Sequence, residues 1–219
     1  DSGATPARLC RDTGEVDAGD SVLVVYSGEP LRSRTRYYYR VRIRDHQEQW
    51  GEWSEASWFE TAFLSQDEWQ ASWIGPTDED EAGGPPEGPH DSAPAPGLRT
   101  EFAAQGPVQS ARLYLAARGF AEVSLNGHPV STDVFVPGWT DYDFRCQYLT
   151  FDATDLVSDG ANAIGAILGD GWYSGRIARI RDKQRRFGAR PQLLCELHLT
   201  YADGREDVVL SDGSWTWRP

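Results

Sequence analysis

The sequence predicts an all-β protein with two consecutive β-sandwich domains, the second a sandwich or jelly roll. Residues 36–44 alternate between apolar or aromatic side chains and mostly arginine, which is the period of a half-buried strand. Residues 193–201 alternate in the same way, and Asn126-Gly127 between two apolar stretches is a strong signal for a two-residue hairpin. Short strands joined by turns, with no amphipathic helical pattern in the first region, favour this architecture.

The first predicted domain covers residues 1–64. A polar loop follows the strand 36–44, and a second aromatic strand ends the domain. Leu31 precedes Tyr37 by six residues, a spacing that resembles the tyrosine corner of fibronectin type III domains, in which a phenol bonds back to the chain. The resemblance covers roughly residues 20–64, which is less than a whole module. We therefore expect a partial fibronectin type III-like sandwich.

The second predicted domain covers residues 65–219 and contains an acidic insertion. Residues 75–97 are rich in Asp, Glu, Pro and Gly and cannot build a core, so we expect an exposed loop. Trp69 and Trp73 lie just before this run, which favours a domain boundary near residue 65. Because the sequence ends in Trp-Thr-Trp-Arg-Pro without a closing strand signal, we expect this domain to be truncated at its C-terminal end.

The composition excludes several classes of partner. The 219 residues carry 21 basic and 34 acidic side chains, and a net charge of −13 repels nucleic-acid phosphates and anionic lipid. No apolar run approaches the roughly 20 residues that span a bilayer. The three cysteines show neither a disulfide framework nor zinc-ligand spacing. We expect no nucleic-acid and no membrane partner, while a cytoplasmic and a secreted location both fit.

No complete catalytic site is predicted. The motifs of serine hydrolases, zinc peptidases and nucleotide-binding proteins are absent from the sequence. Acidic residues are plentiful, but no pair stands out as the two carboxylates that glycoside hydrolysis requires. The four histidines are scattered along the chain. We therefore expect no catalytic residue in this chain.

The segment 137–145, PGWTDYDFR, is a candidate metal site. Asp141 and Asp143 lie two residues apart, so on an extended segment their side chains point the same way. Calcium prefers several oxygen ligands, often Asp side chains together with turn carbonyls. The alternative is an ordinary Asx turn, in which these carboxylates bond to the local backbone.

The segment 168–176, LGDGWYSGR, is a candidate sugar site. Gly169 and Gly171 permit positive φ and a close approach to the backbone. Sugars present apolar C–H faces and a rim of hydroxyls, so their sites combine aromatic surfaces with polar side chains. The candidate residues are Asp170, Trp172, Tyr173 and Arg176. The alternative, aromatic side chains that plug a tight turn, fits the composition nearly as well.

A long, ordered set of motifs resembles the N-terminal β-domain of bacterial α-L-rhamnosidases of glycoside hydrolase family 78. The motifs run from Ala111 to Arg176 as ARLYLAARGFAEVSLNGHPV, VPGWTDYDFRCQYLTFDATDL and NAIGAILGDGWYSGR. Trp215 and Trp217 continue the match. The preceding PLRSRTRYYYRVRIRD and WGEWSEASWFET resemble the fibronectin-type module of the same enzymes, so the likeness covers roughly residues 20–219.

The resemblance implies a non-catalytic part of an enzyme that hydrolyses terminal L-rhamnose from glycosides. In that family, hydrolysis belongs to an (α/α)6-barrel domain further along the chain, which uses Glu and Asp in an inverting mechanism and would be a partner of this region. In some members the jelly roll binds L-rhamnose through a calcium ion. By this resemblance the expected oxygen donors are Asp141, Asp143 and Asp170, and the expected sugar platform is Trp139, Trp172 and Tyr173.

Two other functions compete with sugar binding. The same glycines and aromatic residues also fit a structural spacer that packs against the catalytic domain. A third hypothesis, an adhesion or receptor-type module, rests on WGEWS at 50–54. There, Trp50 and Trp53 are expected to interleave with the arginines at 40, 42 and 44, an arrangement that is usually structural.

Overall fold

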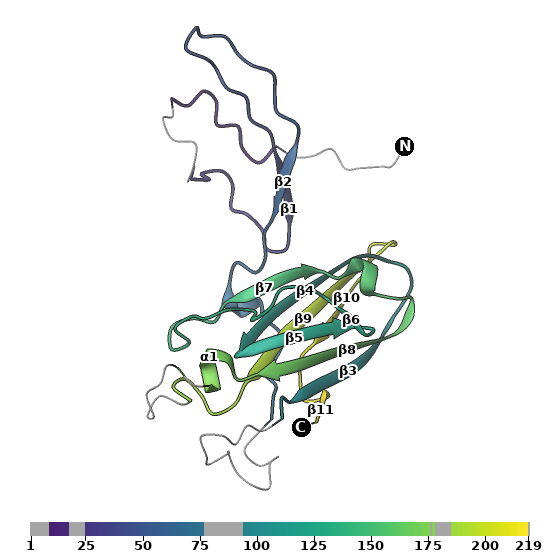
Figure 1. The fold of residues 1–219 in the computed structure, drawn as a ribbon. Coiled ribbons are helices and arrows are strands. Elements are labelled where there is room, and N and C mark those ends of the chain that lie inside the picture. Colours follow the sequence, from purple (N-terminus) through teal and green to yellow (C-terminus); the bar gives the residue numbers. More distant parts are fainter. Residues whose placement is uncertain (1–8, 18–24, 77–93, 176, 178–184, 219) are drawn as a thin grey trace. The chain divides into compact units, whose positions relative to one another are not determined.

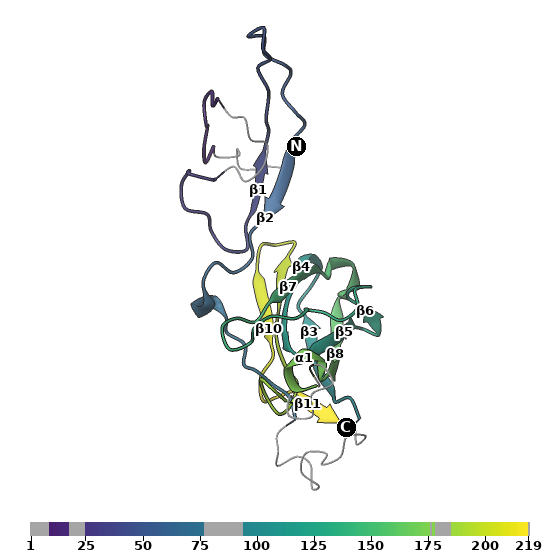
Figure 2. The same ribbon diagram turned by 60° about the vertical axis from the view of Figure 1, so that its left-hand side comes forward.

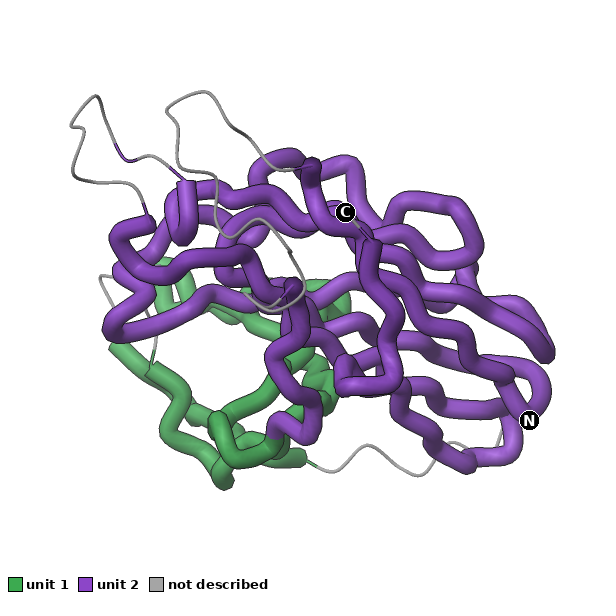
Figure 3. The backbone as a smooth tube through the Cα atoms, turned by 90° about the horizontal axis from the view of Figure 1, so that it is seen from below, with its two compact units in different colours: residues 1–68 green, residues 69–219 purple. Residues whose placement is uncertain are grey.

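The computed structural model describes residues 9–17, 25–76, 94–175, 177 and 185–218. The chain divides into two compact units, residues 1–68 and 69–219, drawn in separate colours in Figure 3. Most of the predicted insertion at 75–97 lies outside the described residues, as does Arg176. Apart from single helical turns, the regular secondary structure of the described residues consists of antiparallel strands, so the all-β prediction is confirmed. No helix among them is long and apolar enough to span a membrane.

The first unit contains an antiparallel pair of strands, β1 (Arg36–Tyr39) and β2 (Ser57–Glu60). The hydroxyl of Tyr37 accepts a hydrogen bond of 2.7 Å from the backbone N–H of Arg32, which is the predicted tyrosine-corner contact. Regular β1 is shorter than the predicted strand 36–44, and beyond it the chain forms an isolated bridge between Arg44 and Trp50.

An alternating stack of guanidinium and indole groups covers one side of this hairpin. We call it the arginine–tryptophan ladder. Arg42 lies between two rings, 4.4 Å from the centroid of Trp50 and 4.6 Å from that of Trp53. The remaining pairs are Arg36 over Trp58 at 4.0 Å, Arg40 over Trp53 at 5.5 Å and Arg44 over Trp50 at 5.8 Å. The predicted interleaving of Trp50 and Trp53 with these arginines is therefore confirmed.

The second unit is a sandwich of two antiparallel sheets (Figures 1 and 2). One sheet has the order β10-β9-β4-β7 and the other β11-β3-β8-β5-β6. Strands β3, β4, β5, β7 and β8 alternate between the two sheets, as in a jelly roll. The strands are β3 (Gly97–Ala104), β4 (Val108–Arg118), β5 (Phe120–Leu125), β6 (His128–Pro129), β7 (Tyr148–Asp152), β8 (Gly160–Gly169), β9 (Gln192–Tyr201), β10 (Glu206–Leu210) and β11 (Thr216–Arg218).

The core of this unit follows the alternation in the sequence. Leu193, Cys195, Leu197 and Leu199 on β9 are buried with the alternate residues of β4, β5 and β8 between the two sheets. The hairpin predicted at Asn126-Gly127 joins β5 to β6, and both residues have positive φ, 54° and 82°. These are the angles that a tight hairpin turn requires and that Asn-Gly tolerates best.

The outer face of β9 differs from the prediction. Glu196 lies on the polar phase of the strand, yet its side chain is fully buried. Its carboxylate accepts hydrogen bonds from the backbone N–H groups of Gln70 and Ala71, the latter at 2.8 Å, and lies 2.7 Å from Nε2 of His198. The segment around Gln70 and Ala71 therefore covers this face of the sheet. Its two N–H groups supply the hydrogen bonds that a buried carboxylate needs.

Candidate functional site

The single-turn helix α1 (Gly171–Ser174) follows β8 at one end of the second unit (Figure 1). Aromatic side chains gather around it. Trp172 on α1 stacks on Trp139, with ring centroids 6.0 Å apart and an interplanar angle of 12°. Its edge packs at 85° against Phe120 at the start of β5, at 4.9 Å. We call Trp139, Trp172 and Phe120 the aromatic platform. It brings together two predicted residues and one that the sequence did not single out.

Glycines bring α1 close to β5. Gly171 has a φ of 51°, and a Cβ there would lie 3.1 Å from the Cα of Gly119. A Cβ on Gly119, whose φ is 113°, would clash with the carbonyl oxygen of Gly169. A side chain at either position would therefore push the two segments apart. Gly119 and Gly171 thus allow the close packing that places Trp172 on Phe120.

Asp170 closes the helical turn. Its Oδ1 accepts a hydrogen bond of 3.0 Å from the Ser174 hydroxyl, and its carbonyl oxygen accepts one of 3.1 Å from the Ser174 N–H. The residue is exposed and lies two positions before Trp172 in the chain. Among the described residues, its second carboxylate oxygen accepts no hydrogen bond, so it offers an acceptor beside the platform.

Two of the three predicted oxygen donors for calcium, Asp141 and Asp143, lie in a turn rather than on an extended segment. The carbonyl oxygen of Asp141 accepts hydrogen bonds from the N–H groups of Phe144 and Arg145, and its Oδ1 accepts one from the N–H of Asp143 at 3.2 Å. Asp143 pairs with Arg186 at 3.0 Å. The chain turns at Asp141, so the extended segment on which the two side chains would point the same way is not formed, and these contacts match the alternative of a local Asx turn. Within the part of the chain that the structure describes, no three His, Cys, Asp or Glu residues form a metal-binding group.

Tyr173 belongs to a different cluster from Trp172. Its ring packs edge-on against Tyr142 at 5.2 Å, and Tyr142 in turn contacts Phe187 at 5.3 Å. Burial raises the pKa of Tyr142, whose hydroxyl donates to the carbonyl oxygen of Gly138 at 3.2 Å. Consecutive residues of a helix point about 100° apart, so α1 sends Trp172 and Tyr173 in different directions. The predicted single sugar platform is thereby divided.

The loop that carries Trp139 also exposes apolar side chains that sequence reasoning missed. Trp139 is 55% exposed, and Val134, Phe135 and Phe144 are 68%, 67% and 85% exposed. Phe135 also touches Phe120 at 5.4 Å. The signal in the sequence was the run Val-Phe-Val before Pro137, which is unusually apolar for a loop.

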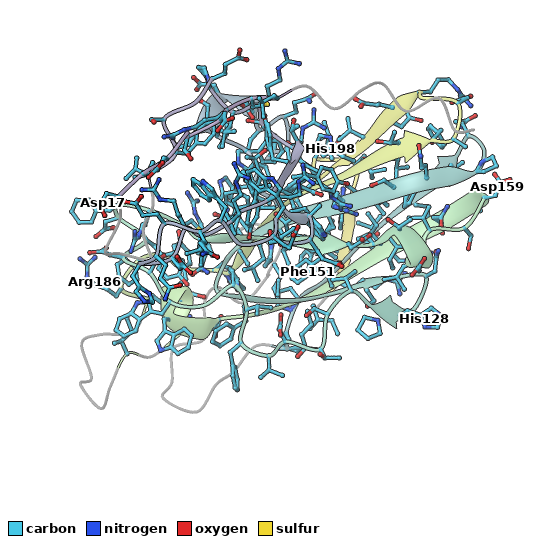
Figure 4. All side chains as sticks on the ribbon, turned by 90° about the horizontal axis from the view of Figure 1, so that it is seen from above. Asp17, His128, Phe151, Asp159, Arg186 and His198 are labelled. Carbon is cyan, nitrogen blue, oxygen red and sulfur yellow. The ribbon has the colours of Figure 1, made fainter. Side chains whose placement is uncertain are left out.

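Figure 4 labels Arg186 at this end of the unit and Asp159, just before β8, at the opposite end.

The sequence matches two family models. One, described as the α-L-rhamnosidase N-terminal domain, matches residues 106–219. The other, described as a Rha78A-like N-terminal immunoglobulin domain, matches residues 2–65. An α-L-rhamnosidase of Alteromonas sp. (strain LOR) is 35% identical over 205 residues, which are 93% of this chain. The chain belongs to the α-L-rhamnosidase N-terminal domain family.

Solved α-L-rhamnosidases have a similar structure over this region. The enzyme of Aspergillus terreus has a TM-score of 0.78 and 35% identity, over 93% of this chain and 23% of that one. The enzyme of Dictyoglumus thermophilum has a TM-score of 0.81 and 28% identity, over 95% of this chain and 23% of that one. The chain also spans only 22% of the Alteromonas enzyme. Members of the α-L-rhamnosidase family thus extend well beyond the matched region.

The resemblance drawn from the motifs is therefore confirmed. The family model that matches residues 2–65 is described as an immunoglobulin domain, whereas the sequence pattern predicted a fibronectin type III-like domain. Both names denote antiparallel β-sandwiches, which share the tyrosine-corner contact seen at Tyr37.

Proposed function

We propose that this chain is the non-catalytic N-terminal region of an α-L-rhamnosidase, an enzyme that hydrolyses terminal L-rhamnose from glycosides. The observation that carries this proposal is the 35% identity to the Alteromonas enzyme across 93% of this chain, which covers 22% of that enzyme. Hydrolysis itself belongs to another part of such an enzyme.

Within that role, the aromatic platform contacts the carbohydrate. The near-parallel stack on Trp172 holds the indole of Trp139 in place, while Trp139 stays 55% exposed. A fixed, flat and exposed indole suits the apolar C–H face of a pyranose ring, and little side-chain entropy is lost on binding. The second oxygen of the exposed Asp170 supplies an acceptor for a sugar hydroxyl. Arg176, also predicted at this site, lies outside the described residues.

Calcium is a separate part of the proposal. A calcium ion at Asp141 and Asp143 would compete with the Arg186 guanidinium for Asp143 and with the backbone turn for Asp141. Because calcium takes six to eight oxygen ligands, it would also need carbonyl oxygens or sugar hydroxyls. L-Rhamnose and calcium would then bind together rather than independently.

The second candidate function is a packing face for another domain of the same enzyme. The observation that favours it is the exposure of Val134, Phe135 and Phe144, which are apolar along their whole side chains and offer nothing to hydroxyl groups. Such residues are normally buried when clustered on one loop. Under this alternative, Trp139 packs against protein rather than sugar.

Isothermal titration of the whole chain with L-rhamnose, in calcium and in EDTA, tests these proposals. The platform proposal expects saturable binding that Trp139→Ala weakens by about 10-fold or more and that Phe144→Ala, on the same loop, leaves unchanged. Binding heat from L-rhamnose in the calcium buffer but not in EDTA would support the coupled calcium site. Heat that Trp139→Ala does not alter, or no heat in either buffer, would overturn the sugar-contact role and favour the packing face.

A further inference from the structure

A cavity of about 560 Å³ lies near the platform but is lined by other residues of the second unit. Its walls come from the segment before β3, from α1, from the start of β9 and from the turn between β10 and β11. Four of the lining residues are aromatic, namely Trp73, Tyr173, Trp215 and Trp217. Of the predicted sugar-site residues that the structure describes, Tyr173 alone lines it. Small-molecule sites typically measure about 300–1,000 Å³, so the cavity has the size of a ligand site.

The aromatic walls are held by neighbouring groups. The Arg118 guanidinium lies 4.4 Å from the ring centroid of Trp73 and 5.8 Å from that of Tyr173. The indole N–H of Trp215 donates to the carbonyl oxygen of Leu210 at 2.8 Å, so its polar atom is satisfied within the fold. At Gly75 a Cβ would lie 2.7 Å from the carbonyl oxygen of Pro191. Glycine there lets the Trp73 segment pack tightly against the start of β9.

The polar groups of the lining leave hydrogen-bonding capacity unused. Oδ1 of Asp212 accepts both the N–H and the hydroxyl of Ser214, at 2.8 and 2.6 Å, and these bonds hold the pKa of Asp212 below its usual value. Its Oδ2 accepts nothing from the described residues. Gln192 accepts from Arg118 at 2.7 Å through Oε1, while its amide nitrogen has no partner in the described part of the chain. One strong acceptor and one donor therefore remain.

The charges of the lining favour a neutral ligand. Asp212 and Arg190 both line the cavity with opposite charges, so the lining has no excess of one sign that would select an anion or a cation. The chain as a whole carries a charge of −13, which further disfavours acidic ligands. Flat rings combined with carboxylate and amide groups suit a molecule that has both apolar faces and hydroxyl groups.

We propose that this cavity is a second saccharide-binding site, which takes a neutral pyranose ring through Trp73, Tyr173 and Trp217 with hydrogen bonds to Asp212 and Gln192. The site is independent of the aromatic platform, because the two share no residue. A chain with both sites would hold two sugar units at the same end of the sandwich. Branched or repeating glycans would then bind more tightly than the single sugars, through effective concentration.

Titrations of four forms of the whole chain with L-rhamnose and methyl β-D-galactoside test the proposal. The forms are the unaltered chain, Asp212→Asn, Trp217→Ala and Trp139→Ala. The cavity proposal expects one saturable component that Trp217→Ala weakens by about 10-fold or more and that Trp139→Ala leaves intact. Asp212→Asn keeps an oxygen for Ser214 and should therefore fold normally, while it weakens the same component by several-fold.

Different results would contradict the cavity proposal and the platform proposal. Binding that Trp139→Ala abolishes and that neither Asp212→Asn nor Trp217→Ala affects would overturn the cavity site and leave the platform. Binding lost in Trp217→Ala and unchanged in Trp139→Ala would support the cavity and reject the platform. Absence of a cavity component with either sugar at millimolar concentration would also overturn the proposal. D-Glucuronate is the matched charged probe, and tighter binding of it than of the neutral sugars would contradict the stated ligand class.

Discussion

The two units bury their apolar side chains to very different extents. Among the described residues of the first unit, Phe63 is the single buried hydrophobic residue, while Val41 and Ile43 are 57% and 78% exposed. In the second unit, whole rows of Leu, Ile and Ala side chains on β4, β8 and β9 are almost fully buried. The first unit instead relies on the arginine–tryptophan ladder and on turn hydrogen bonds such as that of Tyr37.

This difference separates stability from binding surface. Burial of apolar area is the main source of folding free energy, so the second unit supplies a rigid scaffold. Its two candidate sites both lie at one end of that scaffold, on loops and on strand ends. Exposed cation–π contacts are individually weak, so the first unit depends on several of them acting together.

The largest expected effect is in the core of the second unit. Leu197→Ala should lower the free energy of unfolding by about 2–5 kcal/mol, because it leaves a cavity between the sheets. Val41→Ala in the first unit should change it by less than about 0.5 kcal/mol, because that side chain is already 57% exposed. Urea denaturation of both variants provides the comparison. Equal losses would show that the first unit has a core that its exposed fractions conceal.

Glu196 is the next most sensitive position. Glu196→Ala should cost about 3 kcal/mol, because it removes the buried acceptor for the N–H groups of Gln70 and Ala71 and the partner of His198. Glu206→Ala, an exposed position on the neighbouring strand β10, is the control and should be close to neutral. Hydrogen exchange at residues 70 and 71 should rise in the first variant alone. Unchanged exchange there would contradict the proposed role of the carboxylate.

The ladder should respond to loss of planarity rather than loss of charge. Arg42→Lys keeps the charge but removes the flat group between Trp50 and Trp53, at an expected cost of about 0.5–1 kcal/mol. Arg40→Lys is the matched control, since Arg40 faces one ring at 5.5 Å. Thermal unfolding of the first unit, followed by tryptophan fluorescence, should show the larger shift for Arg42→Lys. Identical shifts would mean that stacking adds nothing beyond charge.

Two thiols of the second unit should resist modification. Burial raises the pKa of Cys146 to about 11 and of Cys195 to about 12, so at pH 8 both remain protonated and react slowly with iodoacetamide. Both folded pKa values lie above the ordinary value of 9.0, so the folded state holds these two protons more tightly than the unfolded state does. The stability linked to these protons is complete below pH 9.0 and is lost as pH rises through 11 and 12. Rapid labelling of Cys195 in the folded chain would contradict the packing described for β9.

Sequence patterns predicted the strands, the Asn126-Gly127 hairpin and the Tyr37 contact, because each depends on local spacing. The burial of Glu196 could not be predicted, since the segment that covers it comes from residues 70 and 71, far away in the sequence. The separation of Trp172 from Tyr173 was also missed, because neither a sugar-binding loop nor a tight turn specifies the single helical turn that directs the two side chains apart. Trp217 was recognised only as part of a family motif, and its place on the cavity wall depends on the pairing of β11 with β3.

The nine tryptophans allow one measurement to test the central claim, that carbohydrate binds at this end of the second unit. Indole ¹H–¹⁵N spectra of the whole chain would be recorded during titration with L-rhamnose. We predict saturable shifts for Trp139 and Trp172 at the platform and for Trp73 and Trp217 at the cavity. The ladder residues Trp50, Trp53 and Trp58 should not move. Shifts confined to the ladder, or no indole shift at saturating sugar, would contradict the account.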